Sequence, residues 1–154
     1  MSNILAQTEK AVGVNGILRQ EEVKQIMPRP GEREIASFFA KMPEVIPIYE
    51  KIEGKILDEC EDVMIEIKKT QVTFKSKRGF AYVWLPVRKM KNRPESYLVL
   101  SFGLDKRIES PRIVESIEPY RNRWMHHLIM EKPEEIDDEL MGWIHEAYVF
   151  AKSH

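Results

Sequence analysis

The stretch Val72–Trp84, VTFKSKRGFAYVW, decides the fold class of this chain. From Val72 to Lys75, apolar and polar side chains alternate, which is the two-residue period of a strand with one buried face. The segment that begins at Gly79 is rich in aromatic and β-branched residues, which favour strands. Only Ser76–Arg78 lies between the two segments, and so short a link predicts an antiparallel hairpin.

Similar patterns predict further strands on both sides of this hairpin, at 63–67, 98–102, 113–117 and 124–130, joined as an antiparallel meander. Apolar residues spaced three and four apart predict helices at about 33–41, from Pro43 to about 57, and from an N-cap at Asp137 onward.

The order of these elements predicts an α+β fold of two layers. An antiparallel sheet of about five to six strands would pack on N-terminal helices and a C-terminal helix. The helices would cover one sheet face, and the other face would meet water, a partner or a ligand. Residues 1–31 are expected to form an arm with one short helix, and residues 32–154 a single domain.

The composition is typical of a soluble globular domain, with 43% hydrophobic and 32% charged residues. The single cysteine, Cys60, cannot form an internal disulfide, so a cytoplasmic location is expected. No apolar run is long enough to span a membrane. Glu9 and Lys10 interrupt the first apolar segment, so no signal peptide is expected.

Charges are distributed unevenly along the chain, although its net charge is only −1. Residues 65–93 contain nine basic residues and one acid, whereas 44–64 and 131–154 each contain seven acids and two basic residues. Such a basic block either pairs with the acidic helices and protects a sheet edge, or attracts an anionic ligand.

The basic block interleaves cations with aromatic rings on the predicted hairpin. If Ala81 and Val83 face the helices, Phe80, Tyr82 and Trp84 lie on the open face. Rings beside cations are typical of sheets that bind single-stranded nucleic acid, and equally of pockets for planar anions. Alternatively the rings belong to the core, because the run from 79 to 87 is apolar on both faces.

Arg112, Arg121 and Arg123 form a second basic set, whose planar guanidinium groups suit phosphate or carboxylate. Strand pairing would bring Arg112 and Arg123 to the open face with His127, unless they form surface salt bridges with nearby glutamates. The candidate ligand-binding residues, all expected on or beside the open face, are Lys69, Thr73, Lys75, Arg78, Tyr82, Trp84, Arg112, Arg123 and His127.

The adjacent histidines His126 and His127 do not form a metal motif. In a strand, neighbouring side chains point to opposite faces, so the two rings cannot converge on one ion. His127 shares its face with Arg123, and we expect His127 to be the histidine on the open face.

No other pattern for catalysis or cofactor binding is present. The chain contains neither G-x-S-x-G nor a glycine-rich phosphate loop, and no metal or cofactor is predicted. Acidic neighbours raise the pKa of the Cys60 thiol, which is the wrong direction for a nucleophile.

The chain from about Ile35 to Phe150 resembles an uncharacterised bacterial and archaeal group, the domain of unknown function 5655. The motifs that carry this resemblance are Lys69–Phe74, Arg78–Ala81, Ser110–Ile113, His126–His127, Pro133–Asp137, Trp143 and Glu146–Tyr148. It implies a small α+β domain and assigns no activity. The order of elements is also similar to frataxin-like and YjbR-like folds, some of which are suspected of binding DNA.

Three functions follow as hypotheses. The first is a non-enzymatic domain that binds nucleic acid or a small phosphorylated or carboxylated ligand on the open face. The second is an interaction module that forms a homodimer through that face. The third is an enzyme that uses His127 with Arg112 and Lys69 on an anionic substrate.

Overall fold

The computed structural model describes residues 31–86 and 91–153. The expected N-terminal arm therefore lies almost wholly outside the described residues. The helices are α2 (Glu32–Phe38), α3 (Ile46–Glu59) and α4 (Asp138–Ser153), with 3-10 turns η2 (Pro43–Val45) and η3 (Pro133–Glu135). The strands are β1 (Met64–Ile67), β2 (Val72–Lys75), β3 (Gly79–Trp84), β4 (Leu98–Leu104), β5 (Glu115–Tyr120) and β6 (Arg123–Met130).

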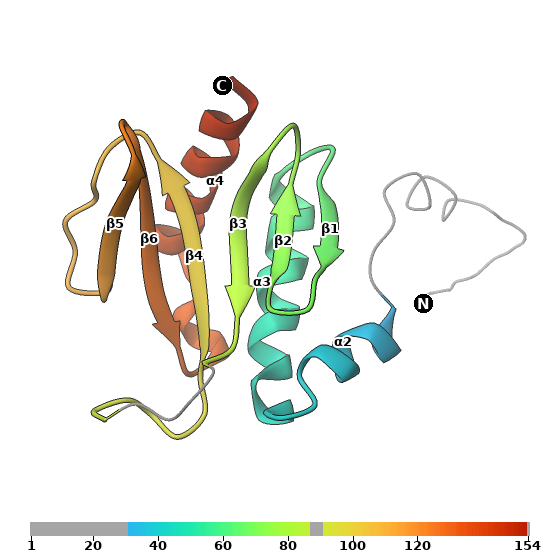
Figure 1. Cartoon of the computed structure of the whole chain (residues 1–154). Coiled ribbons are helices and arrows are strands. Elements are labelled where there is room, and N and C mark those ends of the chain that lie inside the picture. The colour runs from blue at the N-terminus through green and yellow to red at the C-terminus, as the bar shows by residue number, and fades with distance from the viewer. Residues whose placement is uncertain (1–30, 87–90, 154) are drawn as a thin grey trace, which may run out of the picture.

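The six strands form one antiparallel sheet in the order β1-β2-β3-β4-β6-β5 (Figure 1). The predicted meander holds from β1 to β4, but β6 rather than β5 pairs with β4. β5 is mostly exposed and contains Pro119, which has no N–H to donate to a neighbour. Such a strand suits the edge of a sheet, whereas Leu128 and Met130 of β6 are buried in the core.

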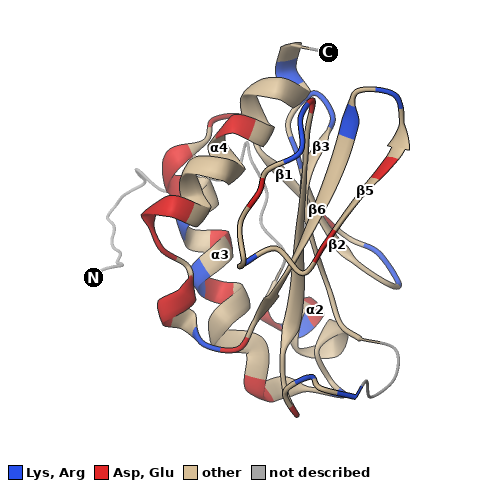
Figure 2. Ribbon diagram, turned by 90° about the vertical axis from the view of Figure 1, so that its left-hand side faces the viewer, with Lys and Arg blue, Asp and Glu red and all other residues tan. Residues whose placement is uncertain are grey.

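Helices cover only one face of the sheet, which confirms the predicted two-layer α+β fold. Figure 2 shows α3 and α4 along one side of the strands, and no helix of residues 31–86 and 91–153 lies over the other side. The core lies between the two layers. Its largest fully buried side chains are Tyr49, Phe39, Phe74, Phe80, Phe102, Ile52, Ile56, Leu98, Leu100, Leu128, Ile136 and Leu140. We call the uncovered side the open face.

The helix starts follow the predicted signals. Pro43 opens η2, where its missing N–H costs no hydrogen bond, and α3 continues from Ile46. An Asp137 carboxylate oxygen accepts the backbone N–H of Leu140 at 3.1 Å, which confirms Asp137 as the N-cap of α4. The first helix ends at Phe38, earlier than the predicted 41.

One predicted orientation is wrong: Phe80 faces the helices, not the open face. Phe74 pairs with Ala81 and Lys75 pairs with Gly79, so Phe80 is an extra residue without a partner on β2. Such a bulge interrupts the alternation of side chains. The Phe80 ring consequently packs edge-on against Tyr148 of α4, with ring centroids 5.4 Å apart.

Candidate ligand-binding site on the open sheet face

A row of polar side chains crosses the open face from edge to edge. The strand register aligns these side chains on one face, in the order Glu66, Thr73, Tyr82, Ser101, His127 and Glu115. Leu100 and Phe102, on either side of Ser101, point into the core and are fully buried. The middle of this row therefore carries hydroxyl and imidazole groups, and each edge strand contributes a carboxylate.

Ser101 links Trp84 and His127 at the middle of this row. The Trp84 indole Nε1–H donates to Ser101 Oγ at 3.0 Å, and Ser101 Oγ lies 2.6 Å from His127 Nδ1. An indole N–H can only donate, so the Ser101 oxygen accepts it. Between Ser101 Oγ and His127 Nδ1 the donor is set by the tautomer of the imidazole, since the serine oxygen can accept a second hydrogen bond or donate its own hydrogen.

Burial lowers the pKa of His127, and the Glu115 carboxylate opposes this shift in part. His127 is therefore a neutral hydrogen-bond donor and not a cation near pH 7. Ser101 is only 1% exposed, so its hydroxyl orients the imidazole but is not open to attack a substrate. The arrangement suits recognition better than nucleophilic catalysis.

Arg123 reaches across the open face from β6 toward β3. Its Nη2 donates to the Tyr82 hydroxyl at 3.4 Å, and its guanidinium lies 6.0 Å from the Tyr120 ring centroid. Gly103 permits this path, because a Cβ there would lie 3.1 Å from Arg123 Nε and 3.1 Å from Met125 Sδ. Among the described residues Arg123 has no carboxylate partner, so its positive charge is not offset by an ion pair.

Two further predicted residues share the open face but make local contacts. Lys75 Nζ lies 3.3 Å from a Glu66 carboxylate oxygen, which offsets part of its charge. The Thr73 hydroxyl accepts a hydrogen bond from Gln71 at 3.0 Å and is nearly buried. Both residues therefore shape this side of the face more than they offer free binding groups.

Lys69 and Arg78 lie at opposite ends of the sheet. Lys69 is in the β1–β2 turn and lines a separate cavity with Arg33 and Phe38. Arg78 is in the β2–β3 turn, at the same end as the β5–β6 turn (Figure 1). Lys69 and His127 do not lie together, because β3 and β4 separate the β1–β2 hairpin from β6.

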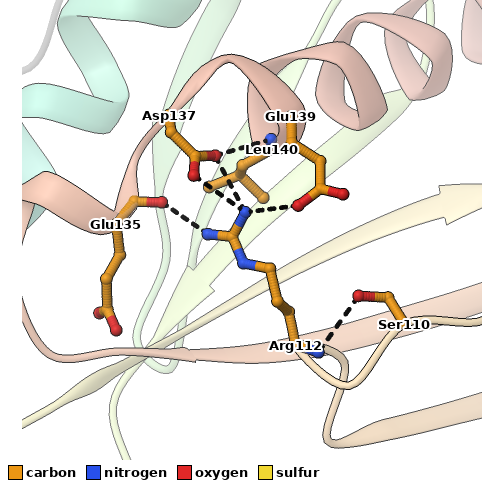
Figure 3. Close-up of polar contacts among 6 residues, drawn as sticks. All are labelled: Ser110, Arg112, Glu135, Asp137, Glu139 and Leu140. Carbon is orange, nitrogen blue, oxygen red and sulfur yellow. Dashed lines mark hydrogen bonds and ion pairs between the residues drawn. The ribbon is translucent and has the colours of Figure 1, made fainter.

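Arg112 is not on the open face, which corrects the expected grouping with Arg123 and His127. Its Nη1 bonds the Asp137 carboxylate at 2.9 Å and Glu139 at 3.0 Å, while Nη2 donates to the Glu135 carbonyl at 2.7 Å (Figure 3). These acceptors bring Arg112 to the first turn of α4, where the Asp137 carboxylate draws it. Arg112 therefore forms salt bridges, as the alternative prediction states. Its partners, however, are Asp137 and Glu139 at the start of α4 and not glutamates close to it in the sequence.

The two histidines lie on opposite faces, as the strand pattern predicts. The His126 ring stacks on Phe102 with centroids 4.8 Å apart, and its Nε2 accepts the backbone N–H of Ile108 at 2.9 Å. Burial, more than any other cause, lowers the pKa of His126. His126 is a core residue, and His127 is the histidine of the open face.

Sequence reasoning missed Ser101 and Gly103. Both lie in β4, LVLSFGL, which is otherwise entirely apolar. The sequence did contain a signal for them. Ser101 is the sole polar side chain of this strand, and Ser101 and Gly103 are two residues apart, so both lie on the same face.

Cys60 and the acidic residues add no second chemical site. Burial, assisted by Glu59, raises the pKa of the Cys60 thiol to about 11, in the predicted direction. Within 31–86 and 91–153, no group of three His, Cys, Asp or Glu side chains is placed to hold a metal ion. No helix in the same ranges has the length and apolar character needed to cross a bilayer.

Residues 35–151 match a family model described as "Domain of unknown function (DUF5655)". No curated protein and no solved structure matches the chain, so the likeness to frataxin-like and YjbR-like folds stays a prediction. The matched range contains every element from β1 to β6, most of α4 and all the residues of the open face discussed above. The chain therefore belongs to the DUF5655 family.

Proposed function

We propose that this domain binds an anionic partner on its open face, and that single-stranded nucleic acid is the partner this face fits best. The observation that carries the proposal is Arg123, which lies over the open face without a carboxylate partner among the described residues and beside the rings of Tyr82 and Tyr120. A guanidinium next to aromatic rings offers both charge and stacking.

The distribution of cations supports an extended partner. Arg78, Arg121 and Arg123 lie toward one end of the sheet, and Lys69 lies in the turn at the opposite end (Figure 1). The seven residues of β4 span roughly 20 Å between these ends at the usual rise of a strand. A single strand that follows β3 would run from the end with Arg78 over Tyr82 and Trp84 toward the end with Lys69, so that phosphates lie near the cations and bases over the rings.

The other two hypotheses have weaker support. An enzyme built on His127, Arg112 and Lys69 would need these side chains together, and they lie in three separate places. A homodimer interface would need a continuous apolar patch. Of the exposed large apolar side chains, Val114, Ile117 and Tyr120 lie in or just before the edge strand β5, Met64 lies on the opposite edge strand, and Val149 lies on α4, so the polar row separates the two edges.

Fluorescence anisotropy with short labelled single-stranded and duplex oligonucleotides, at several salt concentrations, tests the proposal. We expect single-strand binding whose log–log salt slope is about −0.7 for each phosphate neutralised. Arg123→Gln should weaken binding and reduce the slope, whereas Lys55→Gln on the helix side should do neither. The proposal fails if no oligonucleotide binds at low salt, or if binding is independent of salt.

A further inference from the structure

A cavity of ≈ 470 Å³ lies at the end of the sheet that carries the β2–β3 and β5–β6 turns. Three arginines from two hairpins line it: Arg78 from the β2–β3 hairpin, and Arg121 and Arg123 from the β5–β6 hairpin. Asp105, at the end of β4, is the carboxylate among the lining residues. Three guanidinium charges thus face one carboxylate charge, and the volume lies in the range of sites for small ligands.

Within the described part of the chain, these arginines have no anionic partner of their own. None of the three forms an ion pair with a residue in 31–86 or 91–153, unlike Arg107 and Arg112, which are both paired. Arg78 and Arg121 are exposed, and both belong to turns at the rim of the cavity. Gathering like charges without counter-charges is unfavourable, so the cavity is best stabilised by an anion with more than one negative charge.

We propose that this cavity receives the terminal phosphate of a phosphomonoester, which carries close to two negative charges near neutral pH. Guanidinium groups bind phosphate oxygens through paired N–H donors, and three of them match three terminal oxygens. An internal phosphodiester has a single charge and two free oxygens, so it uses this set of donors less fully.

The neighbouring side chains indicate that the phosphate belongs to a nucleotide. The Tyr120 ring is 64% exposed and offers a surface on which a base stacks. Asp105 offers an acceptor for a sugar hydroxyl. Arg123 lines the cavity and also bonds Tyr82 on the open face, whereas Phe150 and Ala151 of α4 line the cavity from the other side of the sheet. The inference rests on the proposed function in one respect: a strand on the open face that continues past Arg123 would end in this cavity.

The test compares two single-stranded oligonucleotides of one sequence, one with a terminal phosphate and one with a terminal hydroxyl, by anisotropy competition. The full chain should prefer the phosphorylated strand by about tenfold, because charged hydrogen bonds are gained at one end. The variant Arg78→Gln/Arg121→Gln should lose most of this preference. The matched variant Lys51→Gln/Lys55→Gln, on α3, should keep it, and thermal unfolding should show both variants folded.

Equal affinity for the two strands, or a preference that survives in Arg78→Gln/Arg121→Gln, overturns the terminal-phosphate site but leaves binding on the open face intact. If neither strand binds, the proposed function fails, and a calorimetric titration with adenosine monophosphate decides the cavity alone. Saturable binding that is lost in the double arginine variant then supports a site for free nucleotides. Lack of saturable binding overturns it.

Discussion

Ser101 Oγ and His127 Nδ1 lie 2.6 Å apart, across the pairing of β4 with β6. Ser101 also accepts the Trp84 indole N–H at 3.0 Å, so one buried hydroxyl holds both rings of the open face in place. This relationship fixes the orientation of the His127 and Trp84 rings in the middle of the open face. Positioned side chains of this kind are typical of binding sites.

Removing the Ser101 hydroxyl should destabilise the fold. Ser101→Ala leaves the Trp84 N–H and His127 Nδ1 without their shared partner in a nearly buried site. We expect the free energy of unfolding, measured with guanidinium chloride, to fall by about 1–3 kcal/mol. Ser37→Ala, at an exposed position of α2, should change it by less than about 0.5 kcal/mol. Equal stabilities of the two variants would show that the Ser101 bonds do not form.

Stability should fall as the pH drops below about 6.5. The pKa values of His126 and His127 are lowered in the folded chain, mainly by burial. Below the ordinary histidine value the unfolded chain therefore binds more protons than the folded chain, and acidification favours unfolding until the lowered pKa values are passed. Unfolding free energies measured at mildly acidic and mildly basic pH check this.

The variant His127→Gln separates the contribution of the open face from that of His126. It should reduce the pH dependence but not abolish it. The Asp137 carboxyl, whose pKa Arg112 lowers, is lost as a stabilising group only below its ordinary value of 3.8, outside this range. A stability that stays level or rises on mild acidification would contradict the buried, neutral histidines.

Substitution of Arg112 should affect stability but not binding, and substitution of Arg123 should affect binding but not stability. Arg112→Gln breaks contacts to Asp137, Glu139 and the Glu135 carbonyl, and should lower the unfolding free energy by about 1–2 kcal/mol without weakening nucleic-acid binding. Arg123→Gln should weaken binding with little change in stability. Arg107→Gln, which removes an exposed ion pair with Glu109, is the matched control for lost charge. Loss of binding in Arg112→Gln at full stability would contradict the placement of Arg112 away from the open face.

Gly103→Ala should reduce binding by displacing Arg123. The added methyl group would lie 3.1 Å from Arg123 Nε, and the flexible arginine can move away from the open face. We expect a weaker affinity for single strands in anisotropy, with only a small loss of stability. Gly54→Ala on α3 meets nothing within 4 Å and should stabilise the chain by about 0.5–1 kcal/mol, with unchanged binding. If Gly103→Ala binds as tightly as the unaltered chain, the position of Arg123 over Gly103 has no part in binding.

The sequence sufficed to predict the fold class and the face of His127, because both depend on local periodicity. Strand alternation places Tyr82 with Trp84 on one side of β3, and places His127 with Arg123 and apart from His126 on β6, whichever strands they pair with. The same rule failed at Phe80, since a bulge adds one residue and its position depends on how β2 and β3 join. The pairing of β4 with β6 instead of β5 could not be predicted from local periodicity either, because two strands compete for the same edge of β4.

Which residues make up the candidate site could be predicted only in part from the sequence. Arg123 shares the strand parity of His127, but Arg112 only precedes a strand, and a loop residue is free to turn toward the nearest carboxylates, here those of Asp137 and Glu139. Lys69 and Arg78 belong to one basic block in the chain, yet successive turns of a hairpin sheet lie at opposite ends. The role of Ser101 follows only from the register, which places it between Tyr82 and His127, and from its hydrogen bond with Trp84.

The most direct measurement of the central claim is a nuclear magnetic resonance titration of the three tryptophan indole N–H signals with a single-stranded oligonucleotide. Trp84 lies on the open face and bonds Ser101, whereas Trp143 stacks near Phe102 on the helix side. Binding on the open face predicts that the Trp84 signal shifts on saturation while the Trp143 signal stays in place. A shift of Trp143 with Trp84 unchanged would contradict the account.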